Sequence, residues 1–101
     1  MTDPAADPAS DGGVLTRTVT IVNRRGLHAR AAARFVKTAE RFKAEITVLR
    51  KDAAVSGLSI MGLMMLAAGP GATLELRASG EEAAAALDAL VKLVADKFDE
   101  D

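Results

Sequence analysis

The order of elements in this chain is decided by residues 23–35, which read NRRGLHARAAARF. The residues before this stretch have the composition of a strand, those after it have the spacing of a helix, and Gly26 permits a tight turn between them. A helix begins with backbone N–H groups that have no partner within the helix, and its dipole adds about half a positive charge there. The stretch therefore predicts an anion site at a strand-to-helix junction.

His28, the only histidine of the chain, stands at this predicted helix start. A neutral imidazole has a nitrogen lone pair that can attack phosphorus, so a covalent phosphohistidine is chemically reasonable here. Arg30 lies two residues further on, and its guanidinium fork suits phosphate oxygens. Three more arginines flank the site and either steer acidic partners or are ordinary exposed residues: Arg24, Arg25 and Arg34. We predict that His28 is the nucleophile and that Arg30 positions the phosphate.

Outward from this stretch, hydrophobic periodicity predicts four strands and three helices. Residues 14–22 alternate apolar residues with threonines, as a half-buried strand does. Apolar residues recur at i, i+3, i+4 and i+7 from Ala32 onward, which is the spacing of an amphipathic helix. The predicted strands are 14–22, 45–50, 53–55 and 72–78, and the predicted helices are 29–42, 59–67 and 81–98. Phe98 is the last apolar residue of the final helical stripe, and Ser79 or Gly80 is expected to cap that helix.

This order of elements predicts an α+β fold. Strands with one apolar face and helices with one apolar stripe bury those surfaces best by packing in two layers. We expect an open-faced two-layer sandwich in which three helices cover one face of a four-stranded antiparallel sheet, in the order βαββαβα. The other face of the sheet is expected to be polar and in contact with water.

Length and composition predict one domain and exclude several classes of protein. The chain has 101 residues, a net charge of −1 and no cysteine. Near-zero charge gives no bulk attraction to nucleic acid or an anionic membrane, and the lack of cysteine excludes disulfides and thiolate catalysis. No stretch approaches the ~20 apolar residues that span a bilayer, so a cytoplasmic protein is expected. We predict a disordered tail over 1–13, one domain over 14–98 and a frayed acidic end over 99–101.

Two segments of the chain resemble a known family, the histidine-containing phosphocarrier proteins (HPr) of bacterial phosphoenolpyruvate-dependent phosphotransferase systems. The first is GLHAR (26–30), which contains the histidine and the arginine, and the second is SIMGLM (59–64), which is similar to the family's regulatory-serine segment. The resemblance covers residues 14–98 and implies the open-faced sandwich. Ala31 stands where the family commonly has proline, which suggests a regulatory, nitrogen-related branch rather than the typical sugar-uptake carriers.

Ser59 stands just before the apolar segment 60–67, where its local role is an N-cap worth ~1 kcal/mol. The resemblance adds that a dedicated kinase can phosphorylate the matching serine, and a phosphate adds a charge of about −1.5 to −2. A helix this short cannot bury every apolar side chain. We expect at least half of five residues in the core and the rest in an exposed patch: Ile60, Met61, Leu63, Met64 and Met65. By resemblance, six residues match positions that contact partner enzymes: Ala29, Ala33, Ile60, Met61, Leu63 and Met64.

The sequence thus predicts a phosphoryl carrier that is a relay rather than an independent enzyme. Its implied partners are an Enzyme I type phosphotransferase, an Enzyme IIA type acceptor and a serine kinase or phosphorylase. No cofactor, metal, nucleic acid or membrane partner is expected. The protein is expected to be a monomer. The main alternative is a regulatory binding module controlled by phosphorylation of Ser59. A small RNA-binding domain is disfavoured because no aromatic residue lies on a predicted strand, and a hydrolase lacks partners for His28.

Overall fold

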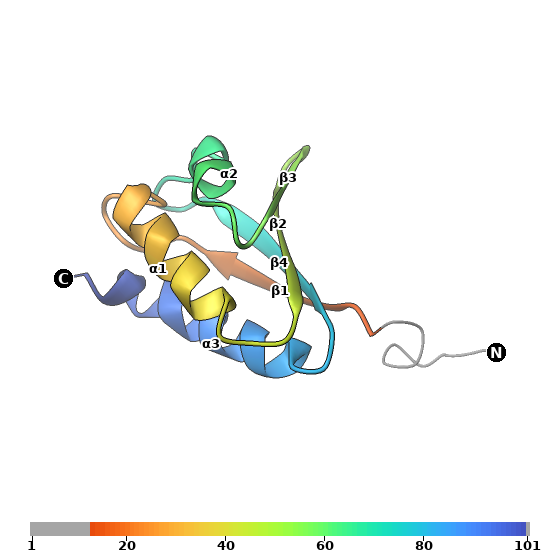
Figure 1. The fold of residues 1–101 in the computed structure, drawn as a ribbon. Helices are drawn as coiled ribbons and strands as arrows, with labels where there is room; N and C mark the ends of the chain where they lie inside the picture. Colours follow the sequence, from red (N-terminus) through yellow and green to blue (C-terminus); the bar gives the residue numbers. More distant parts are fainter. Residues whose placement is uncertain (1–12, 101) are drawn as a thin grey trace.

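The computed structural model describes residues 13–100 and arranges them in two layers (Figure 1). The strands are β1 (Leu15–Thr20), β2 (Glu45–Arg50), β3 (Ala53–Ser56) and β4 (Thr73–Ser79). The helices are α1 (Ala29–Ala39), α2 (Ile60–Met65) and α3 (Ala83–Ala95), followed by a short 3-10 helix, η1 (Lys97–Asp99). This is the predicted βαββαβα order with η1 added. All of the predicted tail except Gly13 lies outside the described residues.

The four strands form one antiparallel sheet in the order β1-β4-β2-β3. The strand that comes last in the sequence, β4, therefore has neighbours on both sides. Val19 of β1 lies opposite Leu74, and Val48 of β2 lies opposite Leu76. These side chains are buried, because the three helices cover this face of the sheet while the other face stays open (Figure 1). The predicted open-faced sandwich is confirmed.

The boundaries of α3 differ from the predicted helix 81–98 at both ends. The helix begins only at Ala83, and neither Ser79 nor Gly80 caps it. Glu82 instead joins the helix to the loop before β2: its side chain accepts a hydrogen bond from the Lys43 backbone N–H at 2.6 Å, and its own N–H donates to the Lys43 carbonyl at 3.0 Å. These contacts are made across 39 residues of sequence, so local cap signals do not reveal them.

The end of α3 is the second difference. Phe98 is fully buried, as its place in the apolar stripe predicts, but α3 ends at Ala95. Lys97, Phe98 and Asp99 have positive φ angles of 59°, 56° and 63°, a left-handed turn that costs roughly 1–2 kcal/mol per non-glycine residue. Burial of the phenyl ring, worth about 1.5–3 kcal/mol, offsets part of this cost. Residues 99–100, predicted to be frayed, follow this anchored side chain and lie beside α1 (Figure 1).

Within residues 13–100, no helix combines the length and the hydropathy needed to cross a bilayer. The longest helix, α3, has 13 residues.

Gly26 holds the loop between β1 and α1 against the loop that follows α2. Its φ angle is +67°, and a Cβ at this position would lie 2.5 Å from the Ala68 carbonyl oxygen and 2.9 Å from the Gly69 Cα. The next residue, Leu27, donates its N–H to that same carbonyl at 2.8 Å. A side chain at position 26 therefore conflicts with backbone, which cannot move aside as a flexible side chain can.

We expect Gly26→Ala to lower the free energy of unfolding by about 2–3 kcal/mol, because it adds both left-handed strain and a backbone clash. Urea denaturation measures the change. Gly69→Ala is the matched control: a Cβ there meets nothing within 4 Å and its φ is not positive. The control should stay within about 0.5 kcal/mol of wild type. Equal losses in both variants would show that the close approach at Gly26 does not constrain the fold.

Candidate functional site

His28 is the N-cap of α1, with an extended backbone (φ −79°, ψ −179°). Its carbonyl accepts the first helical hydrogen bond, from the Ala32 N–H at 2.8 Å. The side chain is 15% exposed, so the imidazole is held in place yet can still be reached from solvent. The first N–H groups of α1, which have no acceptor within the helix, lie next to it. The structure thus places His28 at the helix start, as the sequence predicts.

A carboxylate from the other end of the chain contacts this imidazole. Glu100 Oε2 lies against His28 Nε2, and Glu100 Oε1 accepts a hydrogen bond from Asn23 Nδ2 at 3.2 Å. Asn23 is fully buried and also donates to the Gly26 carbonyl at 2.8 Å, which ties the turn to the carboxylate. A carboxylate can only accept, so His28 Nε2 carries a hydrogen, and in the neutral form of the ring the lone pair is then on Nδ1. The reactive nitrogen of this tautomer is Nδ1.

Sequence reasoning missed both Asn23 and Glu100 as parts of the site. Asn23 belongs to the turn, but nothing in its local pattern shows that its side chain is buried. Its Oδ1 has no hydrogen-bond partner among residues 13–100, an uncommon state for a buried oxygen. Glu100 is one of three consecutive acidic residues and lies 72 positions from His28, so only the folded chain brings it there.

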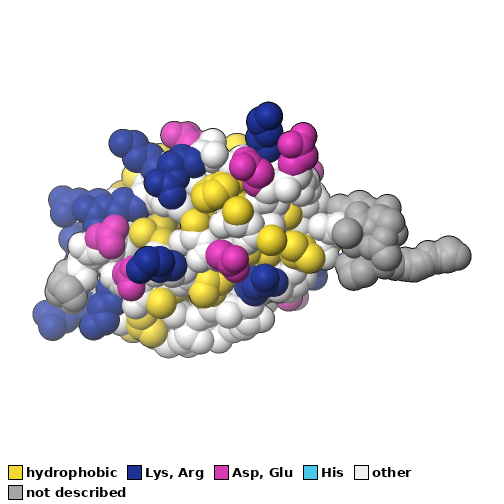
Figure 2. All heavy atoms as spheres, turned by 90° about the horizontal axis from the view of Figure 1, so that it is seen from below, with side chains coloured by type: hydrophobic (Ala, Val, Ile, Leu, Met, Phe, Trp, Pro, Cys, Tyr) yellow, Lys and Arg dark blue, Asp and Glu magenta, His cyan; other side chains and the backbone are white. Residues whose placement is uncertain are grey.

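Three arginines converge beside the imidazole. A hollow of about 290 Å³ is lined by Arg25, Arg30, Arg34, Asp99 and Glu100. Figure 2 shows Lys and Arg side chains gathered at this end of the molecule, where η1 also lies. Arg34 has a structural contact, because its guanidinium donates a hydrogen bond to the Phe98 carbonyl. Arg25 and Arg30 are exposed, so both can meet an incoming anion. Arg24 is exposed and does not line the hollow.

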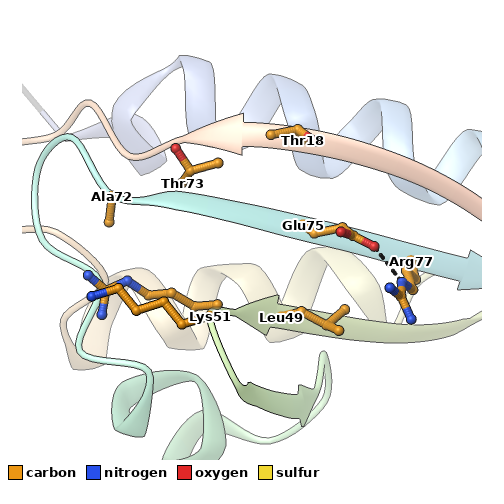
Figure 3. Close-up of a pocket in the computed structure, with 8 residues that line it drawn as sticks. Thr18, Leu49, Lys51, Ala72, Thr73, Glu75 and Arg77 are labelled. Carbon is orange, nitrogen blue, oxygen red and sulfur yellow. Dashed lines mark hydrogen bonds and ion pairs between the residues drawn. The ribbon is translucent and has the colours of Figure 1, made fainter.

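A larger hollow of about 600 Å³ lies on the open face of the sheet, away from His28 (Figure 3). Its walls include Thr18, Thr73 and the ion pair between Glu75 and Arg77, whose N and O atoms are 2.5 Å apart. Figure 3 shows these side chains pointing out from neighbouring strands, with no nucleophile paired to a base.

The α2 patch is a second surface of interest, and we define it as the exposed apolar residues of and next to α2: Leu58, Ile60, Met61, Met64 and Met65. The exposed fractions of Met61 and Met65 are 73% and 78%, too high for core residues. Leu63 is the one buried residue among the five apolar residues of α2, so the expectation that at least half of these five are core is wrong: Ile60, Met61, Leu63, Met64 and Met65. Leu63 is also removed from the predicted partner contacts, because it faces the core beneath the helix.

Helix α2 packs beside α1, which brings the patch close to the histidine end of the molecule. Ala29 is exposed and Ala33 is half-buried on α1. Ser59 caps α2 as predicted, with its Oγ accepting from the Gly62 N–H at 2.9 Å. The two sequence segments that carry the family resemblance therefore meet on neighbouring helices.

A two-layer α+β domain that presents a part-buried histidine at a helix start has the architecture of a phosphocarrier. The chain matches the family model described as the PTS HPr component phosphorylation site over residues 15–96. It is 52% identical to the phosphocarrier protein HPr of Pseudomonas putida over 85 residues, which cover 83% of this chain and 94% of the relative. It is 49% identical to the phosphocarrier protein NPr of Shewanella violacea over 86 residues, which cover 85% of this chain and 94% of the relative.

Solved structures agree with this assignment. The crystal structure of HPr-C-His from Thermoanaerobacter tengcongensis superposes with a TM-score of 0.82 at 41% identity, covering 86% of this chain and 98% of that one. HPr from Bacillus anthracis has a TM-score of 0.77 at 38% identity, with 80% and 96% of the two chains covered. The chain belongs to the HPr family of phosphotransferase-system phosphocarrier proteins.

The pKa of Glu100 lies below its usual range. Partial burial, the largest single influence, acts in the opposite direction because it disfavours the charged form. The hydrogen bonds from His28 and Asn23, together with the electrostatic attraction of His28 and Arg25, outweigh it. A carboxyl group with a lowered pKa in the folded state stabilises the fold above its unfolded pKa. That contribution is lost as the pH falls through the lower folded pKa.

We therefore expect Glu100→Gln to melt at a lower temperature than wild type at pH 7, and at the same temperature at a low pH where the wild-type carboxyl has also become neutral. Thermal unfolding followed by circular dichroism at both pH values measures this. Glu81→Gln removes the same charge from an exposed residue before α3 and should match wild type at both pH values. A Glu100→Gln deficit that stays unchanged as the pH is lowered until the wild-type carboxyl is neutral would contradict the assigned role of the charge.

Proposed function

We propose that this chain is a phosphoryl carrier in which His28 accepts a phosphoryl group from phosphorylated Enzyme I and passes it to an Enzyme IIA type acceptor. The observation that carries the proposal is the part-buried imidazole at the start of α1, with Nε2 held by Glu100. Membership of the HPr family supports it. Such a protein is regenerated in each cycle with its partners, so it acts as a relay rather than as an independent enzyme.

In the proposed step, the Nδ1 lone pair of His28 attacks phosphorus. The bond from phosphorus to the donor atom breaks, and its electron pair stays with the donor. The developing phosphate oxygens meet the first N–H groups of α1 and the guanidinium of Arg30, which is exposed beside the hollow. Transfer to the acceptor is the same displacement in reverse, with His28 as the leaving group.

We propose that donor and acceptor dock on the α2 patch together with Ala29 and Ala33 of α1. A carrier must present one surface to two different proteins, and unbranched methionine side chains adapt to differently shaped partners. Exposed apolar side chains gathered on a short helix mark an interaction surface rather than a core. Ile60, Met61 and Met64 are the members of the patch that the sequence also predicts.

Ser59 is the proposed regulatory site. Its Oγ is half-buried and engaged by the Gly62 N–H, and it precedes the patch directly. A phosphate on Oγ would add about −1.5 to −2 charges beside apolar side chains that partners must desolvate. Phosphorylation is therefore expected to weaken docking while leaving the helix start occupied by a negative group, which its dipole favours.

The regulatory, nitrogen-related branch stays a proposal, because the relatives bear both names, HPr and NPr. The two branches differ in the acceptor. The test measures transfer from the phosphorylated chain to a purified Enzyme IIA protein of each branch. The readout is the rate at which the carrier loses its phosphate. Faster transfer to a sugar-permease component would refute the nitrogen-related proposal.

Phosphate acceptance is tested by intact-protein mass after incubation with Enzyme I and phosphoenolpyruvate. Wild type should gain one acid-labile phosphate and His28→Ala none, because the nucleophile is gone. Arg30→Ala should accept phosphate more slowly, by about tenfold, since it keeps the nucleophile but loses a charge-assisted contact. Arg17→Ala removes an exposed arginine from β1 and serves as the control.

A wild-type chain that takes no phosphate, while a known carrier is labelled in parallel, would refute the carrier function. The regulatory binding module controlled by Ser59 would then be the better assignment.

Docking is tested by the dependence of the phosphorylation rate on carrier concentration. Met61→Glu and Ser59→Asp should each raise the half-saturating concentration several-fold, because both place a charge on the surface that partners bury. Val14→Glu is the control, since Val14 is 55% exposed but precedes β1. An equal effect of all three substitutions would show that the α2 patch is not the docking surface.

A further inference from the structure

The carboxylate of Glu100 is held at His28 by contacts well beyond the histidine itself. The buried amide of Asn23 donates to its second oxygen at 3.2 Å. Phe98, two residues earlier, is fully buried, and its carbonyl accepts a hydrogen bond from Arg34 of α1. The Glu100 side chain is only 12% exposed. A solvated acidic residue would have none of these restraints, so the fold itself brings the carboxylate to the imidazole.

We propose that Glu100 is a positioning residue for His28: its carboxylate orients the imidazole through Nε2 and balances the positive charge that the ring acquires when Nδ1 takes a phosphoryl group. This inference rests on the proposed phosphocarrier function, which does not itself require any acidic residue.

The charge balance of the step shows why a carboxylate matters. The step starts from the neutral form of the His28 ring, which carries its hydrogen on Nε2. Attack by Nδ1 forms a nitrogen–phosphorus bond, while the electron pair of the old bond stays with the donor. No proton leaves the ring in this step, so the imidazole becomes cationic. The donor of the hydrogen bond from Nε2 to Glu100 thereby changes from a neutral ring to a cation, while the acceptor stays an anion. A hydrogen bond between opposite charges is stronger.

The position of Glu100 also keeps its negative charge apart from the incoming phosphate. The carboxylate is bound to Nε2, and the phosphoryl group arrives at Nδ1, on the other side of the ring. Arg25, Arg30 and Arg34 line the same hollow as the acidic residues. The three guanidinium groups outnumber the two carboxylates of Asp99 and Glu100, so the hollow keeps an excess positive charge for the phosphate oxygens.

The test compares wild type, Glu100→Gln and Glu100→Asp, with Glu81→Gln as the matched control. Glutamine keeps the size and one hydrogen-bond acceptor but loses the charge, while aspartate keeps the charge on a shorter side chain. Rapid-quench phosphorylation by phosphorylated Enzyme I is measured as a function of carrier concentration. We expect Glu100→Gln to lower the maximal rate about tenfold with an unchanged half-saturating concentration, and Glu100→Asp to recover part of the rate. Glu81→Gln should match wild type.

A spectroscopic readout tests the contact without any transfer. Long-range nitrogen–proton NMR of the unphosphorylated protein should show a protected proton on His28 Nε2 in wild type and a rapidly exchanging one in Glu100→Ala. Urea midpoints of all variants confirm that each is folded at the assay temperature. If Glu100 only stabilised the fold, the rate loss of its variants would disappear at a lower temperature, where they are fully folded. The rate loss proposed here persists in the fully folded variant.

The outcomes separate this inference from the proposed function. Phosphorylation of wild type and Glu100→Gln at equal maximal rates would refute the role of Glu100 and leave the carrier function standing. A wild-type protein that takes no phosphate would refute the carrier function and with it the charge-balancing role. A rate loss that appears only as a raised half-saturating concentration would assign Glu100 to partner docking and overturn the positioning role.

Discussion

The close approach of the β1–α1 loop to the loop after α2 is the constraint on which the site depends. Leu27 donates to the Ala68 carbonyl at 2.8 Å, and Ile21 exchanges backbone hydrogen bonds of 2.8 Å with Gly71 and Ala72. Only a glycine fits at position 26, because its φ is +67° and Ala68 backbone fills the space of a side chain. These contacts set the direction in which α1 leaves the sheet, and so they set the position of His28.

A second constraint comes from the end of α3. The left-handed residues 97–99 would be unfavourable in an isolated peptide, and they persist because Phe98 is buried and its carbonyl is bonded to Arg34. Glu100 then reaches His28 and the buried Asn23. The histidine is thus held from both ends of the domain: the turn before α1 places its backbone, and the segment after α3 engages its ring. The proposed nucleophile, fixed in this way, needs little reorganisation before it reacts.

Much of the fold and part of the site follow from local sequence patterns. The alternation in the strands and the spacing from Ala32 in α1 predict the correct elements, because each pattern reflects a face that must be buried. The Ser59 cap is also predicted correctly, since its acceptor and donor lie three residues apart. The burial of Leu63 is not predicted, because a segment that is apolar on every side does not show which side meets the core. The pairing of Glu82 with Lys43 is invisible for a similar reason: it joins two distant loops.

The sequence by itself determined the order of elements, the two-layer class and the histidine at a helix start, because these depend on periodicity, turn residues and the short motif around His28. Only the tertiary structure decided which side chains surround that histidine. Asn23 is buried, and Arg34 donates a hydrogen bond to the Phe98 carbonyl. Glu100, 72 residues from His28 in the sequence, contacts the imidazole. The reason is physical: hydrogen bonds and ion pairs between distant residues form only after packing has brought their backbones together, and no local pattern encodes that distance.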